Sequence, residues 1–310
     1  MLGDVLDSLQ NKQPKHRKVV RIMRYSALYS VVAGLALGGM LLPGSALAEK
    51  RTPFTATETD DLPQNFPWFP GTDGKWYVFD GRETFDMVSD EPRVAGRGEY
   101  SMYAIMDLTG ALTLWGEFHI KNAGGGWDGF YTGTENGFTA TCVGSGEYEG
   151  LISRWQWTPT SDGNGIYHWK GYIVENGPGE VPFKVSGLRV ERFVPINPGQ
   201  MPFYVAAPLD EGWGQASHIG VFTDLKKIGL VKFTSPTTAI FRGTGIVQAA
   251  NGDLLNWVAF GTKDANQTDI SVFFAGGTGR FEHAVGSYSG QLQGQSPVSY
   301  TYEATGKIRY

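Results

Sequence analysis

The chain has 310 residues, of which 41% are hydrophobic and 13% aromatic, and this composition excludes a disordered protein. Its 43 glycines follow no Gly-X-Y period, which excludes collagen, and glycine at this density disfavours long helices. The formal net charge is −5. Six basic and two acidic residues precede Glu49, which leaves 20 basic and 29 acidic residues from Glu49 onward and a net charge of −9. A negative surface repels phosphate backbones, so we expect no nucleic acid partner.

The first 48 residues have the pattern of an export signal. Basic residues precede an apolar stretch over residues 25–42, and Ala46-Leu47-Ala48 follows as a small-x-small cleavage motif. We therefore predict a signal peptide over 1–48, a periplasmic or extracellular protein and no membrane span after cleavage. Two alternatives stay open. The apolar stretch is just long enough for a retained anchor, and translation could start at Met23 rather than Met1.

Short β-rich segments separated by turn residues dominate the chain from Trp76 onward. They are rich in Thr, Val, Ile and aromatic residues, and Gly, Asn, Asp and Pro interrupt them about every ten residues, as in antiparallel barrels or sandwiches. No convincing helical period of ten residues is found. Cys142 is the only cysteine, so no intramolecular disulfide can form, and we expect it to be a small core residue.

An internal repeat divides this β-rich region. Residues 273–284 align with residues 140–151, and residues 302–308 align with residues 167–173. The predicted fold class is all-β, with two homologous antiparallel barrel units that are separate or fused into one double barrel. The predicted parts are a Pro-rich lead-in over 49–74, a first unit over 75–176, a linker over 177–196 with a possible strand at 183–193, and a second unit over 197–310.

Three motifs of the second unit carry a family resemblance. They are the segments Ser217–Thr223, Gly243–Asp253 and Gly276–Phe281, in this order. With them the chain resembles exported bacterial proteins that have an allene oxide cyclase-like, calycin-type β-barrel, most clearly over 217–310. The first unit departs from the pattern, because Gly125 and Val143 stand where the second unit has Asp253 and Gly276. The resemblance implies a barrel with a ligand-sized lumen and no particular activity.

The segment 112–120 carries the only candidate proton-handling pair. Strand alternation places Trp115, Glu117 and His119 on one face. If that face lines the lumen, Glu117 and His119 can exchange protons with a bound molecule. The competing interpretation is an incidental pair on a solvated outer face. The second unit favours the latter, since its aligned residues carry no such groups: Gly243, Gly245 and Val247.

Aromatic residues of the first unit are the candidate ligand contacts. Trp115 and Tyr131 are candidates for a cavity wall, and Trp155 and Trp157 share a strand face that could stack on a flat ligand or simply fill the core. The four histidines after Ala48 show no zinc-binding spacing, and no cofactor motif occurs, so we expect no metal and no cofactor.

Two classes of function stay open on this basis. The first is a non-catalytic exported module that binds a small apolar molecule or a partner surface. The alternative is a cyclase or isomerase of the allene oxide cyclase or dirigent type, which confines a reactive intermediate in the lumen. A purely structural or surface-assembly role is a third possibility without a positive feature. Neither the ligand nor the oligomeric state follows from the sequence.

Overall fold

Eight antiparallel strands close the first barrel, and β1 (Lys50–Asp60) shows the inward and outward alternation expected of a barrel wall. The computed structural model describes residues 49–61, 66–157, 166–175, 177, 179–200, 202–264, 267–296 and 299–310. The predicted signal segment 1–48 lies outside the described residues. The barrel strands are β1 (Lys50–Asp60), β3 (Trp76–Ser89), β4 (Gly96–Met106), β5 (Leu112–Lys121), β6 (Gly125–Thr134), β7 (Gly137–Gly146), β8 (Ile152–Trp157) and β9 (Ile166–Glu175).

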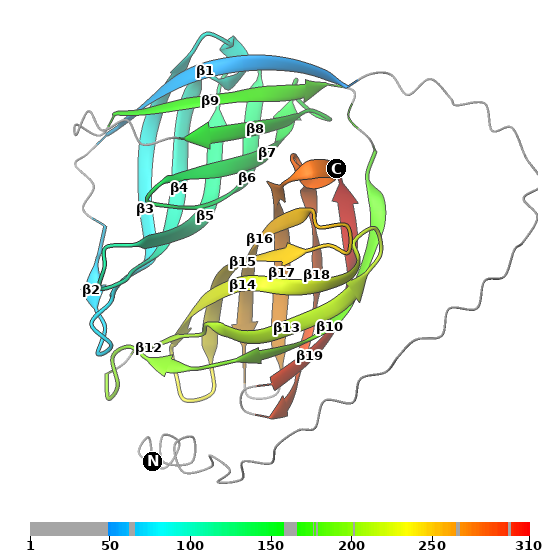
Figure 1. Cartoon of the computed structure of the whole chain (residues 1–310). Helices are drawn as coiled ribbons and strands as arrows, with labels where there is room; N and C mark the ends of the chain where they lie inside the picture. The colour runs from blue at the N-terminus through cyan, green and yellow to red at the C-terminus, as the bar shows by residue number, and fades with distance from the viewer. Residues whose placement is uncertain are drawn as a thin grey trace, which may run out of the picture. The chain divides into compact units, whose positions relative to one another are not determined.

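The first sheet closes because β1 pairs with both β3 and β9. The short β2 (Phe69–Pro70) extends the sheet beside β3, and the 3-10 turn η1 (Pro92–Val94) connects β3 to β4. Figure 1 shows this barrel in blue to green.

The second barrel repeats the same order of strands and closes on itself in the same way. Its strands are β10 (Val181–Glu191), β13 (Leu209–Ala216), β14 (Gly220–Phe233), β15 (Ala239–Gln248), β16 (Leu254–Lys263), β17 (Thr268–Gly277), β18 (Val285–Ser296) and β19 (Ser299–Arg309). The short β11 (Val194–Pro195) and β12 (Phe203–Ala206) lie between β10 and β13 in sequence, and the 3-10 turn η2 (Gly279–Phe281) follows β17. Figure 1 shows this barrel in green to red.

The predicted fold class is confirmed: the chain is nearly all β and forms two separate closed barrels. The strand registers also match the repeat. Phe54 on β1 pairs with Gly171 on β9, and Phe183 on β10 pairs with Gly306 on β19. A side chain on Gly171 would collide with the Phe54 ring and the Arg154 carbonyl, and one on Gly306 would collide with the β18 backbone at Ser287 and Tyr288, so both positions require glycine.

The structure moves the start of each barrel upstream of the predicted bounds. The segment 49–74 contains β1, the strand that closes the first sheet, rather than only a lead-in. The segment 177–196 contains β10, which closes the second sheet, so the possible strand at 183–193 is part of a barrel rather than of a linker. The physical reason is closure, because without these strands two edges of each sheet would be left unpaired.

Aromatic side chains fill the inside of the first barrel. Phe85, Phe118, Trp127 and Trp155 are fully or almost fully buried there, and Cys142 is also buried among them, as expected. Tyr148 after β7 and Phe281 in η2 are equivalent in the repeat, and each packs into the core of its own barrel.

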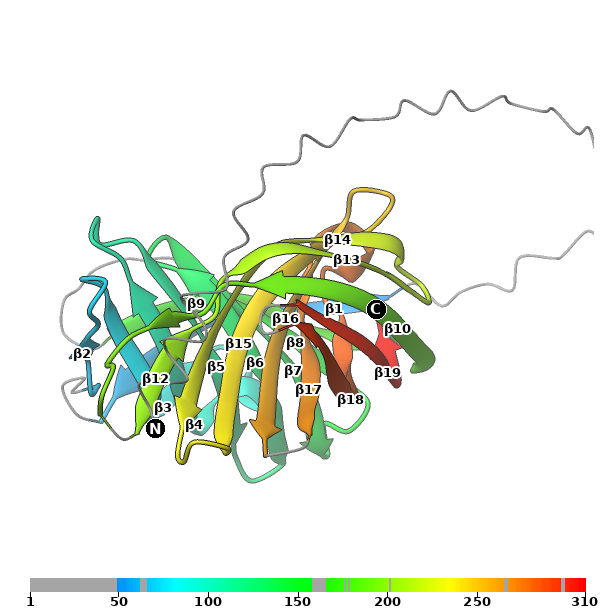
Figure 2. The ribbon, with the colours of Figure 1, turned by 90° about the horizontal axis from the view of Figure 1, so that it is seen from below.

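The barrels meet through the outer faces of their walls. Trp115 and Tyr103 from the first barrel share a buried cluster with Val258 and Leu230 from the second. The Thr132 and Thr244 hydroxyl oxygens lie 3.0 Å apart across this contact. Figure 2 shows this contact, in which β16 and β17 lie against β6 and β7.

Candidate ligand site in the first barrel

The faces of β5 decide which of its residues can meet a molecule in the lumen. Leu114, Phe118 and Ile120 pack into the core of the first barrel, so this apolar face is the inner one. Glu117 and His119 alternate with them and lie on the outer face. The face that carries Glu117 and His119 therefore does not line the lumen, and these residues cannot exchange protons with a molecule bound there. A catalytic role for them elsewhere stays a prediction.

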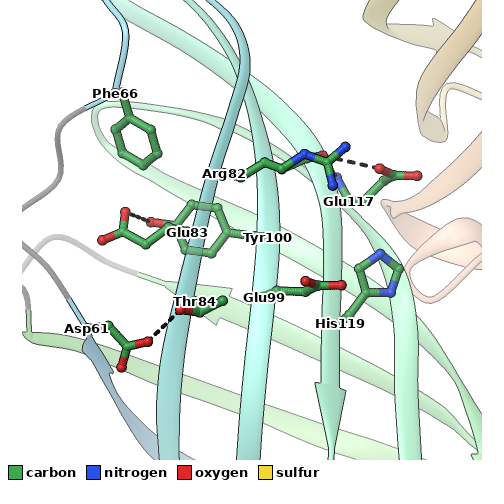
Figure 3. Close-up of a pocket in the computed structure, with 10 residues that line it drawn as sticks. Asp61, Phe66, Arg82, Glu83, Thr84, Glu99, Tyr100, Glu117 and His119 are labelled. Carbon is green, nitrogen blue, oxygen red and sulfur yellow. Dashed lines mark hydrogen bonds between the residues drawn. The ribbon is translucent and has the colours of Figure 1, made fainter.

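Glu117 and His119 instead line a groove of about 500 Å³ on the wall formed by β3, β4 and β5. The His119 Nδ1 atom lies 2.8 Å from the Asp128 carboxylate, and the Ser101 hydroxyl accepts a hydrogen bond from the Glu117 backbone N–H at 3.0 Å. Figure 3 shows Glu117, His119 and Glu99 gathered apart from the pair of Glu83 and Tyr100. The outer pair is thus held by its own neighbours in the sheet.

The register also corrects the sequence alignment of this strand. Gly116 pairs with Tyr131, and Gly243 pairs with Ala259 at the same level of the second barrel. Gly243 therefore corresponds to Gly116 rather than to Trp115. A slip of one residue exchanges the two faces of a strand, so the predicted equivalents Gly243, Gly245 and Val247 are inward residues and not counterparts of Trp115, Glu117 and His119.

The lumen of the first barrel contains a cavity of about 210 Å³ near the end where β5 begins. Its wall is mostly aromatic and aliphatic, with one buried carboxyl group from Glu58. The lining residues are Glu58, Phe66, Trp68, Tyr100, Met102, Leu112, Leu114, Phe118, Tyr131, Thr134, Glu135, Phe138, Trp157, Tyr167 and Trp169. No lysine, arginine or histidine is among these described lining residues.

The predicted contact residues fall in different places. Tyr131 and Trp157 line the cavity. Trp155 is fully buried in the core of the barrel, where its ring meets Phe54 at a centroid distance of 4.6 Å. Trp115 faces outward and is buried between the two barrels, so it is not a wall of the lumen. These four side chains therefore do not form one site.

The carboxyl groups at this end of the lumen favour their protonated forms. Burial raises the pKa of Glu58 well above its usual range, and the neighbouring Asp60 raises it further. The Trp169 indole N–H donates a hydrogen bond of 2.8 Å to the Glu58 carboxyl. Burial and Asp60 also raise the pKa of Glu83 to about 7, although the hydrogen bond from the Tyr100 hydroxyl opposes this shift. The lumen therefore holds acidic groups that tend to keep their protons near neutral pH.

The second barrel fills the corresponding space with its own charged side chains. The Arg189 guanidinium donates to the Asp224 carboxylate at 2.8 Å, and Lys227 forms an ion pair with Glu191. The Arg189 guanidinium also lies 4.8 Å from the centre of the Trp257 ring. Buried charges of both signs are thus matched inside this barrel, as buried ions require.

Sequence reasoning missed Glu58, Glu83 and Tyr100 as site residues. Glu58 lies in the segment that was expected to be a lead-in, and Glu83 lies after an irregularity in β3 that changes which residues face inward. The available signal was the alternation Phe54, Ala56, Glu58, which places a carboxyl group on an otherwise apolar strand face.

Comparison with models of known protein families gives no match, and comparisons with curated proteins and with solved structures give none either. Within the described part of the chain, no helix has the length and apolar character needed to cross a membrane. The same described residues contain no group of three or more His, Cys, Asp or Glu side chains placed to hold a metal ion.

Proposed function

We propose that this protein is an exported, non-catalytic module that binds a small, largely apolar molecule in the lumen of its first barrel. The observation that carries this proposal is the cavity of about 210 Å³, with a wall built mainly of Trp, Tyr, Phe, Leu and Met side chains. Pockets for drug-sized ligands usually begin at about 300 Å³. The volume therefore favours a compact molecule. Export and the family resemblance stay predictions.

The alternative, a cyclase or isomerase, requires proton-handling groups beside the confined molecule. The pair assigned to that role, Glu117 and His119, lies on the outer face of the wall. A binding function needs only the shape and chemistry of the cavity, so we prefer it.

The proposal is tested with 4-fluorotoluene, a compact aromatic probe. Its ¹⁹F NMR line should broaden saturably when the protein is added, because the probe exchanges into the cavity. Leu112→Trp places a larger side chain at the half-buried lining position and should abolish the broadening. Leu108→Trp is the matched control, since Leu108 is 77% exposed and outside the cavity lining. Absence of saturable broadening, or equal broadening with Leu112→Trp, would refute the proposal.

A further inference from the structure

We propose that the molecule held in the first barrel is a small organic cation, such as a quaternary or primary amine with apolar substituents. This inference rests on the proposed binding function and specifies its ligand class. Its basis is the difference between two lumens that the same chain builds with the same strand order.

The first step is to identify equivalent positions. Phe54 and Phe183 each pair with a glycine on the last strand of their barrel, Gly171 on β9 and Gly306 on β19. Six residues further along the strand, β1 carries Asp60 and β10 carries Arg189. The acidic Asp60 thus stands where the second barrel has a buried guanidinium.

A second pair of equivalent positions also differs in charge between the two barrels. Gly98 on β4 pairs with Ile120, and Asp224 on β14 pairs with Val247 at the equivalent level. The next inward residue on β4 is Tyr100. On β14 the next inward residue is Lys227, displaced by the irregularity that follows Asp224. Both buried cations of the second lumen are therefore missing from the first.

The second lumen shows what this architecture does with a cation. Arg189 is held by the Asp224 carboxylate and lies 4.8 Å and 4.9 Å from the ring centres of Trp257 and Tyr302. The Lys227 ammonium lies 5.1 Å from the centre of the Phe241 ring. Aromatic faces and carboxylates together are a favourable environment for a desolvated cation.

The first lumen has the same two components and an empty volume between them. Glu58 is 3% exposed and lines the cavity, together with the rings of Tyr100, Trp157 and Trp169. An entering cation would meet the Glu58 carboxyl group and the aromatic rings that line the same cavity. It would also balance the acidic groups that otherwise hold protons, because a nearby positive charge favours the ionised carboxylate.

Choline and its neutral isostere 3,3-dimethylbutan-1-ol separate charge from shape. Isothermal titration of the whole protein at pH 8 should show choline binding at least tenfold more tightly than the alcohol. Equal affinity would overturn the cation inference and leave the proposed binding function standing. If neither compound binds but 4-fluorotoluene does, the cation inference fails alone. If all three fail, both proposals fail.

Substitutions locate the effect. Glu58→Gln should weaken choline binding at least tenfold while changing the affinity for 3,3-dimethylbutan-1-ol less than twofold. Glu303→Gln removes an exposed carboxylate of the second barrel and should change neither affinity. Asp60→Arg introduces the guanidinium that the second barrel already contains and should abolish choline binding. Unchanged choline affinity in Glu58→Gln and Asp60→Arg would refute the assigned site.

Proton release gives an independent readout. The titratable groups around the site are Glu58 and Asp60 on β1, Glu83 on β3, Tyr100 on β4, Tyr131 on β6, Glu135 after β6 and Tyr167 on β9. Choline should bind more tightly as the pH rises from 5.5 to 8.5, and below neutrality each binding event should release protons, measured as a buffer-dependent enthalpy. An affinity that does not change over this range would contradict the inference.

Discussion

Single side chains inside the two barrels show how burial selects a charge state. In the second lumen each buried ion has a partner of opposite charge, as in the pair of Arg189 and Asp224. In the first lumen Glu58 receives a hydrogen bond from the Trp169 indole and has another carboxyl group, Asp60, beside it. Desolvation is costly for a carboxylate in this setting, so protonation is the less costly solution.

The raised pKa of Glu83 predicts a pH dependence of stability. An unfolded glutamate has a pKa of about 4.3, whereas the pKa of Glu83 in the folded protein is about 7. Between these values the folded state binds more protons than the unfolded state, so the contribution of Glu83 to stability falls as the pH rises and levels off above about 7. Urea unfolding at pH 5 and pH 8 should show a smaller loss of stability in Glu83→Gln than in the unmodified protein.

The control for this measurement is Glu303→Gln, because Glu303 lies on the exposed face of β19. It should keep the pH dependence of the unmodified protein. A Glu83→Gln variant with the same slope as the unmodified protein would show that Glu83 does not retain its proton.

At the scale of elements, the strands that close the barrels lie far in sequence from some of their partners. β1 pairs with β9, and β10 pairs with β19 at the end of the chain. The alternation of β1 places Phe54, Ala56 and Glu58 inside, while the threonines between them face outward. Each barrel thus depends on a contact that spans its whole sequence, and non-local contacts of this kind make folding slow.

The role of β10 predicts how fragments behave. A chain of residues 179–310 contains all eight strands of the second barrel and should unfold in one cooperative urea transition monitored by circular dichroism. A chain of residues 197–310 lacks β10, which leaves β13 and β19 with unpaired edges. It should aggregate or unfold without a cooperative transition. Cooperative unfolding of the shorter chain would show that β10 is dispensable for closure.

At the scale of the whole molecule, the contact between the barrels uses Trp115, an outward residue of β5 that precedes Glu117 and His119. Trp115 is fully buried there, against Tyr103 at a centroid distance of 6.1 Å. The ring of Phe130 on β6 stacks on Phe273 of β17 at 4.4 Å. The inner face of β5 therefore lines the lumen of the first barrel, and its outer face contacts the second barrel.

This placement predicts that Trp115 matters for stability and not for the cavity. Trp115→Ala should lower the free energy of unfolding by about 3–5 kcal/mol, the usual cost of removing a buried Trp side chain. The affinity for 4-fluorotoluene should change less than twofold. Trp76→Ala is the matched control, because Trp76 is 42% exposed, and it should cost less than about 1 kcal/mol. Loss of probe binding with unchanged stability would instead place Trp115 at the site.

The all-β class, the repeat and the two barrel units can be predicted without the structure, because alternation and turn residues are local patterns and self-similarity is visible on comparing segments of one chain. Of the four aromatic residues that the sequence predicts as ligand contacts, Tyr131 and Trp157 line the cavity of the first barrel. That β1 and β10 belong to the barrels becomes visible in three dimensions, because barrel closure pairs segments that are distant in sequence. The tertiary structure also decided that the apolar face of β5 is the inner one, which moved Glu117 and His119 outside. The strand registers also show that Asp60 and Arg189 occupy equivalent positions, so that the first lumen is acidic and the second contains balanced charges. In the sequence, each of the two looks like an ordinary polar residue on a strand.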